Sequence, residues 1–387
     1  MVFKVESRAT IREYLANVQT RSLGILFALN AVLFSNWAVR IPDVKSTLGL
    51  SDADLGWALL ASPFGVVLCT PLVGYLIHKY GPGKVSMLGA ISFCLSVSLL
   101  SIPNSFFQLA LALFILGMAN GTMDISMNAL ASALEKEQSK IMMSMTHGFW
   151  SFTAMIASLI AGLIASTDLP YGIHFIGTSI LVFILLFLAV RDISDVTDSA
   201  ESSIQWQWPG MTVFLLIIIA FIVFLVEGGI MDWNSLYYRE VLGSPVAMMS
   251  FGFAAFSLAM AIARFYGDSL FSKYSSKMII SIGCLIVSVG LFMFSFGTSI
   301  WLSTLAMMIT GIGCSVLIPI LFREAGLLPD VPPSLGIASV STFGYTGFLA
   351  GPPVIGFISE AYDLQTSFMC LAVFMLSAVL ISLLLRM

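Results

Sequence analysis

Three polar side chains recur at every fourth position of one apolar stretch, ILGMANGTMDISMNALA, which begins at Ile115. They are Asn120, Asp124 and Asn128. A spacing of four places them on one face of a helix. A lone charge in hydrocarbon costs roughly 2.5–3.5 kcal/mol on insertion scales, so Asp124 is expected to face protein or water. A carboxyl group in such a place can bind and release a proton.

The next apolar stretch supplies a candidate partner, His147. The two stretches should form an antiparallel hairpin about the turn EKEQSK, and Asp124 lies as far before its centre as His147 lies after it. We therefore expect both side chains at a similar depth, with His147 and Ser151 on one face of their helix. Because imidazole titrates near neutral pH, the pair could carry a proton. An alternative interpretation is that these polar residues only hydrogen-bond helices to one another.

A second acidic cluster lies in FLVEGGIMDWNSLYY. Glu227 precedes two glycines, Gly228 and Gly229, which could bend or unwind the helix beside an acidic group and so form part of a binding site. The alternative interpretation is that the glycines only allow close helix packing. Asp232 is expected near the outer surface as a cap or gate residue.

Further candidates lie along other apolar stretches. Asn36 and Arg40 share a helix face, and Arg40 is expected to pair with Asp43 or Asp232. Four other tryptophans are expected to be interfacial anchors, which leaves three as candidates for stacking on a ligand. The anchors are Trp57, Trp206, Trp208 and Trp301; the candidates are Trp37, Trp150 and Trp233.

Two features indicate moving parts. Arg264 and Asp268 are four residues apart and are expected to form an ion pair at a cytoplasmic gate. In GYTGFLAGPPVIGFI, Tyr345 and the nearby glycines suggest close packing and a hinge, and Pro352 and Pro353 should interrupt the hydrogen-bond ladder of the helix.

Composition places these residues in a membrane. Of the 387 residues, 58% are hydrophobic and 10% are charged, against about 25% charged in soluble domains. A helix needs about 20 apolar residues to cross the hydrocarbon. Twelve stretches meet that need: 21–41, 53–77, 84–102, 106–132, 140–165, 171–190, 209–236, 246–270, 277–296, 299–322, 335–359 and 365–385.

Lysine and arginine positions orient these spans. With the N-terminus inside, thirteen basic residues lie in inner segments and three, Arg40, Lys45 and Arg239, in outer ones. This bias places both termini in the cytoplasm. The N-terminal MVFKVESRATIREYLANVQTR has no small-residue cleavage site after it and is expected to be a retained tail. The five cysteines lack metal-ligand spacing and are expected to be buried thiols.

The chain divides into two six-helix halves, 1–190 and 209–387, joined by a polar, acidic linker at 191–208. A weak repeat supports the division, because GYLIHKYGPGK after the second span resembles DSLFSKYSSK after the eighth. Tyr80 and Tyr274 are 194 residues apart, as are Lys79 and Lys273. The predicted fold class is therefore all-α integral membrane, with twelve helices in two pseudo-symmetric halves.

The whole chain resembles bacterial transporters of the major facilitator superfamily. Several stretches are similar to its YbjJ-like subgroup, with a looser likeness to fucose-permease-type proteins: NWAVRIPDVKSTLGLS, MDISMNALASALE, HGFWS, EGGIMDWNSLYY and GYTGFLAGPPVIGFI. Two departures are evident. His78 stands where the family loop after Gly74 usually has aspartate, and the Gly-Pro pattern of drug antiporters is missing from the fifth span.

The resemblance implies a secondary transporter that works by alternating access on a small solute in the bacterial inner membrane. Proton coupling through Asp124, Glu227 and His147 is our hypothesis; sodium is an alternative. Few buried cations reach the expected cavity, which favours a neutral polar solute or a cation over an anion. An exporter of amphipathic metabolites or drugs remains open, as does a non-transporting sensor or scaffold. We expect a monomer in contact with lipid, with no enzymatic activity, cofactor, metal or nucleic-acid partner.

Overall fold

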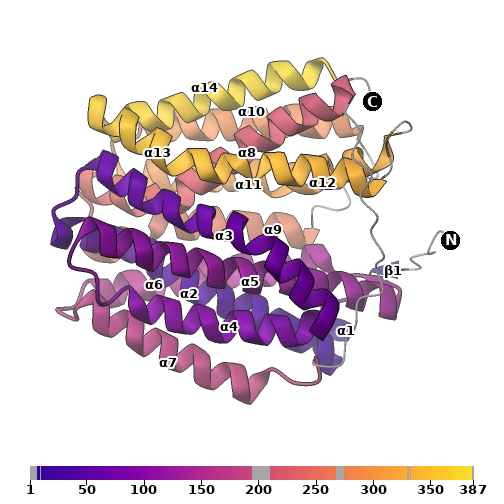
Figure 1. The fold of residues 1–387 in the computed structure, drawn as a ribbon. Coiled ribbons are helices and arrows are strands. Elements are labelled where there is room, and N and C mark those ends of the chain that lie inside the picture. Colours follow the sequence, from indigo (N-terminus) through magenta and orange to yellow (C-terminus); the bar gives the residue numbers. More distant parts are fainter. Residues whose placement is uncertain are drawn as a thin grey trace. The chain divides into compact units, whose positions relative to one another are not determined.

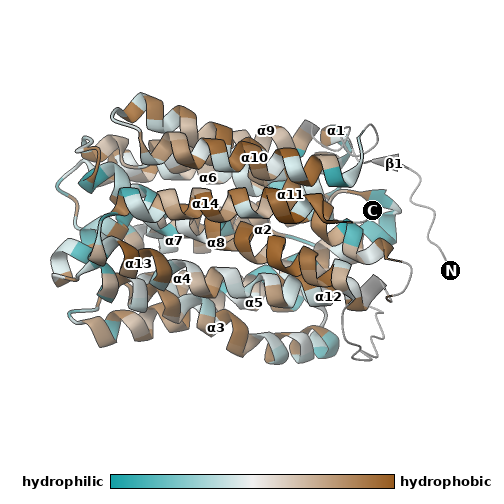
Figure 2. Cartoon of the chain, turned by 90° about the horizontal axis from the view of Figure 1, so that it is seen from above, coloured by the Kyte–Doolittle hydropathy of each residue, from teal (hydrophilic) through white to brown (hydrophobic). Residues whose placement is uncertain are grey.

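The computed structural model describes residues 7–8, 10–193, 210–266, 274–328, 331 and 333–385. Within them, eleven helices are long and apolar enough to cross a membrane. They match eleven of the predicted spans, and the remaining span, 335–359, is divided into two shorter helices. In Figure 2, hydrophobic residues fill the middle of the long helices and hydrophilic residues gather toward their ends.

The chain forms two compact units. Unit 1 comprises Met1–Gly49 and Ala61–Ala200, and unit 2 comprises Leu50–Leu60 and Glu201–Met387. The helix α3 contributes its first turns to unit 2 and the remainder to unit 1. Figure 1 shows both units as bundles of long helices.

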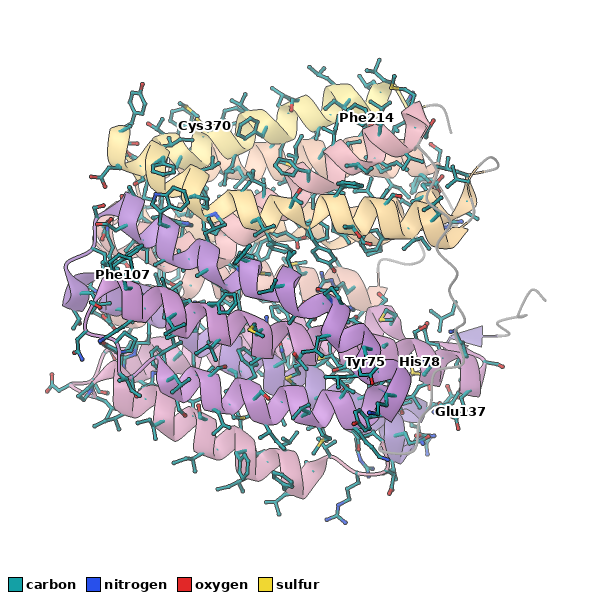
Figure 3. The ribbon with its side chains drawn as sticks, in the orientation of Figure 1. Tyr75, His78, Phe107, Glu137, Phe214 and Cys370 are labelled. Atoms are coloured by element: carbon teal, nitrogen blue, oxygen red, sulfur yellow. The ribbon has the colours of Figure 1, made fainter. Side chains whose placement is uncertain are left out.

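Unit 1 is arranged around one helix, α2, which packs against α4, α5, α6 and α7, while α4 also packs against α5 and α7. Its elements are β1 (Ser7–Arg8), α1 (Ile11–Ala16), α2 (Val18–Leu48), α3 (Asp52–Tyr80), α4 (Pro82–Leu99), α5 (Phe106–Gln138), β2 (Lys140–Ile141), α6 (Met143–Ala165) and α7 (Tyr171–Ala189). Phe107 and Glu137 mark the two ends of α5 in Figure 3. This helix extends beyond the predicted span, 106–132, because the charged residues that follow the span are good helix formers.

Unit 2 repeats this arrangement around α8, which packs against α11, α12, α13 and α14, while α10 packs against α11 and α14. Its elements are α8 (Met211–Glu240), the 3₁₀ turn η1 (Val246–Met248), α9 (Phe251–Tyr266), α10 (Ser276–Ser295), α11 (Ile300–Leu327), α12 (Pro333–Gly344), α13 (Thr346–Ala361) and α14 (Leu364–Leu383). Apart from the α2–α4 pair, each of these unit 1 pairs has a counterpart in unit 2, six spans later, which agrees with the predicted internal repeat.

Small residues allow the helices to approach closely. A Cβ atom at Gly117 of α5 would collide with the Ser62 carbonyl of α3, and one at Gly347 of α13 would collide with the Phe221 carbonyl of α8. Small residues at such positions are typical of helix pairs in membranes, where close van der Waals contact drives association.

The eleventh span breaks at Tyr345, between α12 and α13. Pro352 and Pro353, which we expected to interrupt the hydrogen-bond ladder, lie inside α13; they lack the N–H groups that the ladder needs, but the helix does not end at them. The break falls where the Phe348 N–H donates to the Tyr345 carbonyl at 3.0 Å, an i+3 bond that replaces the helical i+4 pattern. The Tyr345 ring stacks on Phe224 of α8 with centroids 4.6 Å apart, which holds the break against α8.

The N-terminal segment docks onto unit 1. Strand β1 pairs in parallel with β2. Glu13 of α1 forms an ion pair with Lys140 at 2.8 Å, and the side chain of Tyr14 is buried against α6. This contact was not predicted, because charge alone marked the segment only as a tail.

Candidate functional site

Asp124, Asn128 and His147 form one hydrogen-bonded chain in unit 1. The Asn128 Nδ2 donates to the Asp124 Oδ1 at 3.2 Å and to the Asp124 carbonyl at 2.9 Å. The Asn128 Oδ1 lies 3.0 Å from the His147 Nε2. Because an amide oxygen only accepts, the His147 Nε2 must carry the proton of that bond. The predicted pair is thus brought together, with Asn128 between its members.

Phe27 of α2 packs against His147, at one end of this hydrogen-bonded network. Its ring meets the His147 ring edge to face, with centroids 5.1 Å apart. Asp124, Asn128 and His147 are all half-buried. The three side chains therefore present a polar surface that is neither sealed in the core nor fully open.

A second polar chain ties three helices together through Asn30, a residue that we did not predict. The Trp150 Nε1 of α6 donates to the Asn30 Oδ1 of α2 at 2.9 Å. The Asn30 Nδ2 in turn donates to the Asn120 Oδ1 of α5 at 2.9 Å. Asn30 is 4% exposed, whereas Asn120 and Trp150 are half-buried. An asparagine in the apolar run LFALNAVLF was the signal that could have found it.

Asn36, Trp37 and Ser151 are buried between helices. The Asn36 Nδ2 donates to the Val32 carbonyl of its own helix at 2.7 Å, and its Oδ1 accepts from the Thr178 hydroxyl of α7 at 3.4 Å. These contacts fit the interpretation of Asn36 as a link between α2 and α7.

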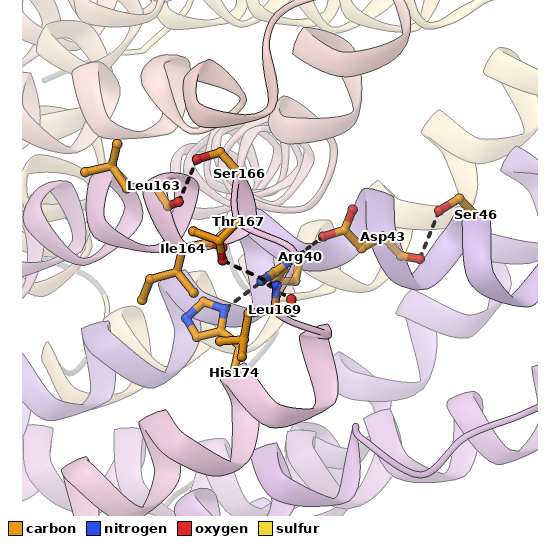
Figure 4. Close-up of polar contacts among 9 residues, drawn as sticks. All are labelled: Arg40, Asp43, Ser46, Leu163, Ile164, Ser166, Thr167, Leu169 and His174. Atoms are coloured by element: carbon orange, nitrogen blue, oxygen red, sulfur yellow. Dashed lines mark hydrogen bonds and ion pairs between the residues drawn. The ribbon is translucent and has the colours of Figure 1, made fainter.

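Arg40 in unit 1 is held by acceptors on three sides, as Figure 4 shows. Its Nη1 pairs with Asp43 at 2.7 Å, its Nη2 donates to the Leu169 carbonyl at 3.1 Å, and its Nε donates to the His174 Nδ1 at 3.1 Å. The predicted pairing with Asp43 is confirmed. Since the His174 Nδ1 accepts this bond, His174 is neutral and carries its proton on Nε2.

Unit 2 contains a buried charged cluster on α8, α9 and α11. Glu227 is 6% exposed, and it interacts electrostatically with Arg264 and with the Cys314 thiol. Among the residues that the structure describes, the Glu227 Oε1 has no hydrogen-bond partner. The predicted partner of Arg264, Asp268, lies outside the described residues.

The glycines that follow Glu227 do not unwind the helix, so the unwinding that we considered is ruled out. Helix α8 runs unbroken from Met211 to Glu240. A Cβ atom at Gly228 would lie 2.8 Å from the Phe348 ring, and one at Gly229 would meet the Ile355 side chain. The glycines therefore serve close packing against α13, which was the alternative interpretation. Asp232 is half-buried, Trp233 is fully buried, and the Tyr345 ring is 45% exposed.

The start of α3 packs on the end of α13 within unit 2, a contact that we did not predict. The Glu360 Oε2 accepts from the Asp52 N–H at 3.0 Å, and the Asp52 carboxylate accepts from the Ser359 hydroxyl. The carboxylate of α13 thereby caps the N-terminus of α3. Trp57 and Phe357 meet edge to face at 5.5 Å.

In the described part of the chain, no group of three or more His, Cys, Asp or Glu side chains could hold a metal ion. All five cysteines are free; Cys370 is half-buried and the other four are buried. The two exposed tryptophans, Trp57 and Trp301, fit the prediction of interfacial anchors, while Trp206 and Trp208 lie outside the described residues.

Two units of long apolar helices with repeated helix pairing and polar chains inside are the architecture of a multi-pass membrane transporter. The sequence profile of the Major Facilitator Superfamily matches residues 23–329 and 216–387. The chain belongs to this superfamily.

Relatives and solved structures agree with this assignment. An uncharacterised MFS-type transporter of Yersinia pestis is 30% identical over 377 residues, with 97% of each chain covered. Membrane protein MosC of Rhizobium meliloti is 29% identical and covers 87% of this chain and 83% of its own. A bacterial homologue of the human lysosomal transporter Spinster has a TM-score of 0.75 at 15% identity, with 96% of this chain and 97% of that chain covered.

Membership of a transporter family also supports the expectation that the chain is not an enzyme.

Proposed function

We propose that this transporter is a proton-coupled secondary transporter of a small neutral polar or cationic solute. The hydrogen-bonded chain Asp124–Asn128–His147 is the observation that carries the proposal. It places a half-buried carboxyl group and an imidazole on one network inside a membrane unit, where ionisable residues are costly unless they serve a function.

Asp124 is the proton-binding group in this proposal. An ionised Asp124 accepts from Asn128, and a proton on the carboxylate weakens that bond and frees the Asn128 amide to turn. An amide does not itself conduct a proton, so Asn128 couples the orientation of His147 to the charge of Asp124. The network therefore has two arrangements that differ by one proton, which alternating access needs.

Glu227 is the second proton-binding candidate. Its carboxylate is buried near Arg264, and a neutralised Glu227 would leave the arginine without that charge partner. Proton binding would thereby loosen the contact between α8 and α9. The same reasoning applies to sodium only if oxygen ligands gather around Glu227.

The charges of the site support the solute class. Arg40 is engaged by Asp43, and Arg264 lies by Glu227, so neither offers an unpaired positive charge to an anion. A solved structure that the fold resembles is the nucleoside transporter NupG, with a TM-score of 0.71, 16% identity, and coverage of 95% of this chain and 99% of that chain. Nucleosides and sugars are therefore the first solutes to test.

Alternating access assigns roles to the parts of the chain. In this proposal the halves 1–190 and 209–387 rock about the linker 191–208, with both termini in the cytoplasm of a bacterial inner membrane. The α3–α13 contact around Asp52 and Glu360 then closes the outer side, and it must open in each cycle.

A stability screen followed by flux tests the proposal. Purified protein is heated with sugars, nucleosides, amino acids and polyamines at acidic and neutral pH; a solute at 100 times its Kd stabilises the folded state by about 2.7 kcal/mol. Hits are then assayed in proteoliposomes under a pH gradient. We expect Asp124→Asn and Glu227→Gln to abolish gradient-driven uptake but not exchange at equal pH.

Glu137→Gln is the matched control, since Glu137 lies exposed on the same helix as Asp124 (Figure 3). Uptake that keeps its full pH dependence in the Asp124→Asn, Glu227→Gln double variant would refute proton coupling. Uptake that depends on a sodium gradient instead would identify sodium as the coupling ion.

A second candidate function is drug export. The quinolone resistance protein NorA of Staphylococcus aureus is 31% identical over 156 residues, which is 38% of each chain. This likeness favours an exporter of amphipathic compounds over an importer. Efflux of a lipophilic fluorescent cation from loaded vesicles, with no uptake of sugars or nucleosides, would select this candidate.

A further inference from the structure

We propose that Asn30 is a positioning residue that turns Asn120 into a hydrogen-bond donor for the solute and fixes the Trp150 ring beside it. The inference rests on the proposed transport function and deepens it. It assigns to unit 1 a solute that offers an uncharged acceptor oxygen next to a flat or apolar face.

The donor and acceptor roles along the hydrogen bonds Trp150–Asn30–Asn120 are set by Trp150. An indole N–H donates and cannot accept, so the atom of Asn30 that lies 2.9 Å from the Trp150 Nε1 must be the carbonyl oxygen. This bond removes the usual ambiguity between the two ends of an asparagine amide. The Asn30 amino group is then forced to point the other way, toward α5.

Asn30 in turn fixes the orientation of the Asn120 amide. The Asn30 Nδ2 donates to the Asn120 Oδ1 at 2.9 Å and to the Met123 Sδ at 3.5 Å, so both of its hydrogens are used. The Asn120 carbonyl is thereby occupied. Within the described residues, the Asn120 amino group has no recorded acceptor, and Asn120 is half-buried while Asn30 is buried.

Trp150 supplies the flat face. Its N–H is held by Asn30, and its ring lies 6.1 Å from that of Phe34, one turn further along α2. Two points of contact with α2 fix the plane of the indole. A planar ring with an amide donor nearby suits the hydroxyl-bearing and apolar faces of a sugar or nucleoside.

Variants of Asn30 separate the two roles. Asn30→Leu removes both bonds. Asn30→Asp still accepts from Trp150 and, at a pH where its carboxyl group is ionised, cannot donate to the Asn120 carbonyl. Asn120 must then turn its amino group toward residue 30 and leave its carbonyl for the solute. Asn30→Asp should therefore act like Asn120→Asp, which puts an acceptor at the same place directly.

The first measurement needs no solute. Protein labelled with ¹⁵N at tryptophan gives indole signals that Trp150→Phe assigns. We expect the Trp150 indole proton to move upfield and to exchange about tenfold faster with water in Asn30→Leu. In Asn30→Asp the signal should keep its position or move downfield, since a charged acceptor bonds more strongly. An unchanged signal in Asn30→Leu would show that Asn30 does not hold the Trp150 indole, and would overturn the proposal.

The second measurement uses two probe pairs that differ by one ring oxygen, which can accept a hydrogen bond but cannot donate one: D-galactose with its carbocyclic analogue, and uridine with carbocyclic uridine. Binding is followed by thermal stability and by uptake. We expect wild-type protein to favour one member of a pair by about tenfold, the value of one hydrogen bond. Asn30→Asp and Asn120→Asp should lose that preference together, while Asn104→Asp, in the exposed loop before α5, should retain it.

The outcomes separate this proposal from the transport mechanism. A preference that survives in Asn30→Asp would overturn the donor role of Asn120, even if uptake remains proton-driven. A wild-type protein that binds none of the four probes would overturn the solute class. Uptake without pH dependence, in a protein that keeps the Trp150–Asn30–Asn120 hydrogen bonds, would count only against proton coupling.

Discussion

Docking of the N-terminal segment should depend on Tyr14. Its side chain is 1% exposed, its ring stacks on Phe149 with centroids 5.3 Å apart, and its hydroxyl lies 3.0 Å from the Thr146 Oγ1. Because the Thr146 hydroxyl already donates to the Met142 carbonyl at 2.9 Å, the Tyr14 hydroxyl is the donor. Burial raises the pKa of Tyr14, so this donor keeps its proton throughout the neutral range.

The expected magnitudes follow from these contacts. Tyr14→Phe removes one neutral hydrogen bond, worth about 0.5–1.5 kcal/mol, and should raise the undocked population roughly two- to twelvefold. Tyr14→Ala also removes a buried ring, and large aromatic-to-alanine changes cost about 3–5 kcal/mol. Its undocked population should therefore rise by more than about a hundredfold.

Trypsin cleavage after Arg12 measures that population. Arg12 is exposed, but the protease needs a locally undocked chain, so the cleavage rate follows the open fraction when docking is fast. Tyr75→Phe is the control, since Tyr75 is exposed on α3. If Tyr14→Ala is cleaved no faster than wild type while its helices stay folded, the buried contact does not hold the segment.

Three further predictions concern charged groups. A hydrogen bond from Lys140 lowers the pKa of Glu13 from 4.5 to about 2. A carboxylate whose pKa is lowered in the docked state stabilises that state fully above its unfolded pKa, and this stabilisation is lost as the pH falls through its folded pKa. The undocked population, measured as the trypsin cleavage rate after Arg12 divided by the rate on an unfolded substrate at the same pH, should therefore not vary between neutral pH and about pH 5; a marked rise there would contradict this reasoning. Asp43→Asn leaves the buried Arg40 without its charge partner and should cost about 3–5 kcal/mol, seen as a lower melting temperature in detergent; no change would mean that water replaces Asp43. The Glu135 Oε1 accepts from two N–H groups at the start of α6, at 2.6 and 2.7 Å, so Glu135→Ala should cost about 0.5–2 kcal/mol; faster hydrogen exchange at the start of α6 would report it, and unaltered exchange would exclude the cap.

Packing could not be predicted from the local sequence. The Gly228-Gly229 pair was compatible with either an unwound helix or a close contact, and only the side chains of Phe348 and Ile355 from another helix decided for contact. Likewise, the two adjacent prolines weaken the ladder of α13 without ending it, and the eleventh span is divided instead at Tyr345, whose ring stacks on Phe224. Tertiary contacts outweighed local propensity in both places.

The sequence by itself determined the spans, the internal repeat and the short list of polar residues, because the cost of placing polar groups in hydrocarbon acts on each segment separately. Only the tertiary structure decided which of those residues meet. It placed Asn128 between Asp124 and His147, and Asn30 between Trp150 and Asn120. Hydrogen bonds need partners within about 3 Å, and helices that are far apart in sequence supply those partners only after they pack.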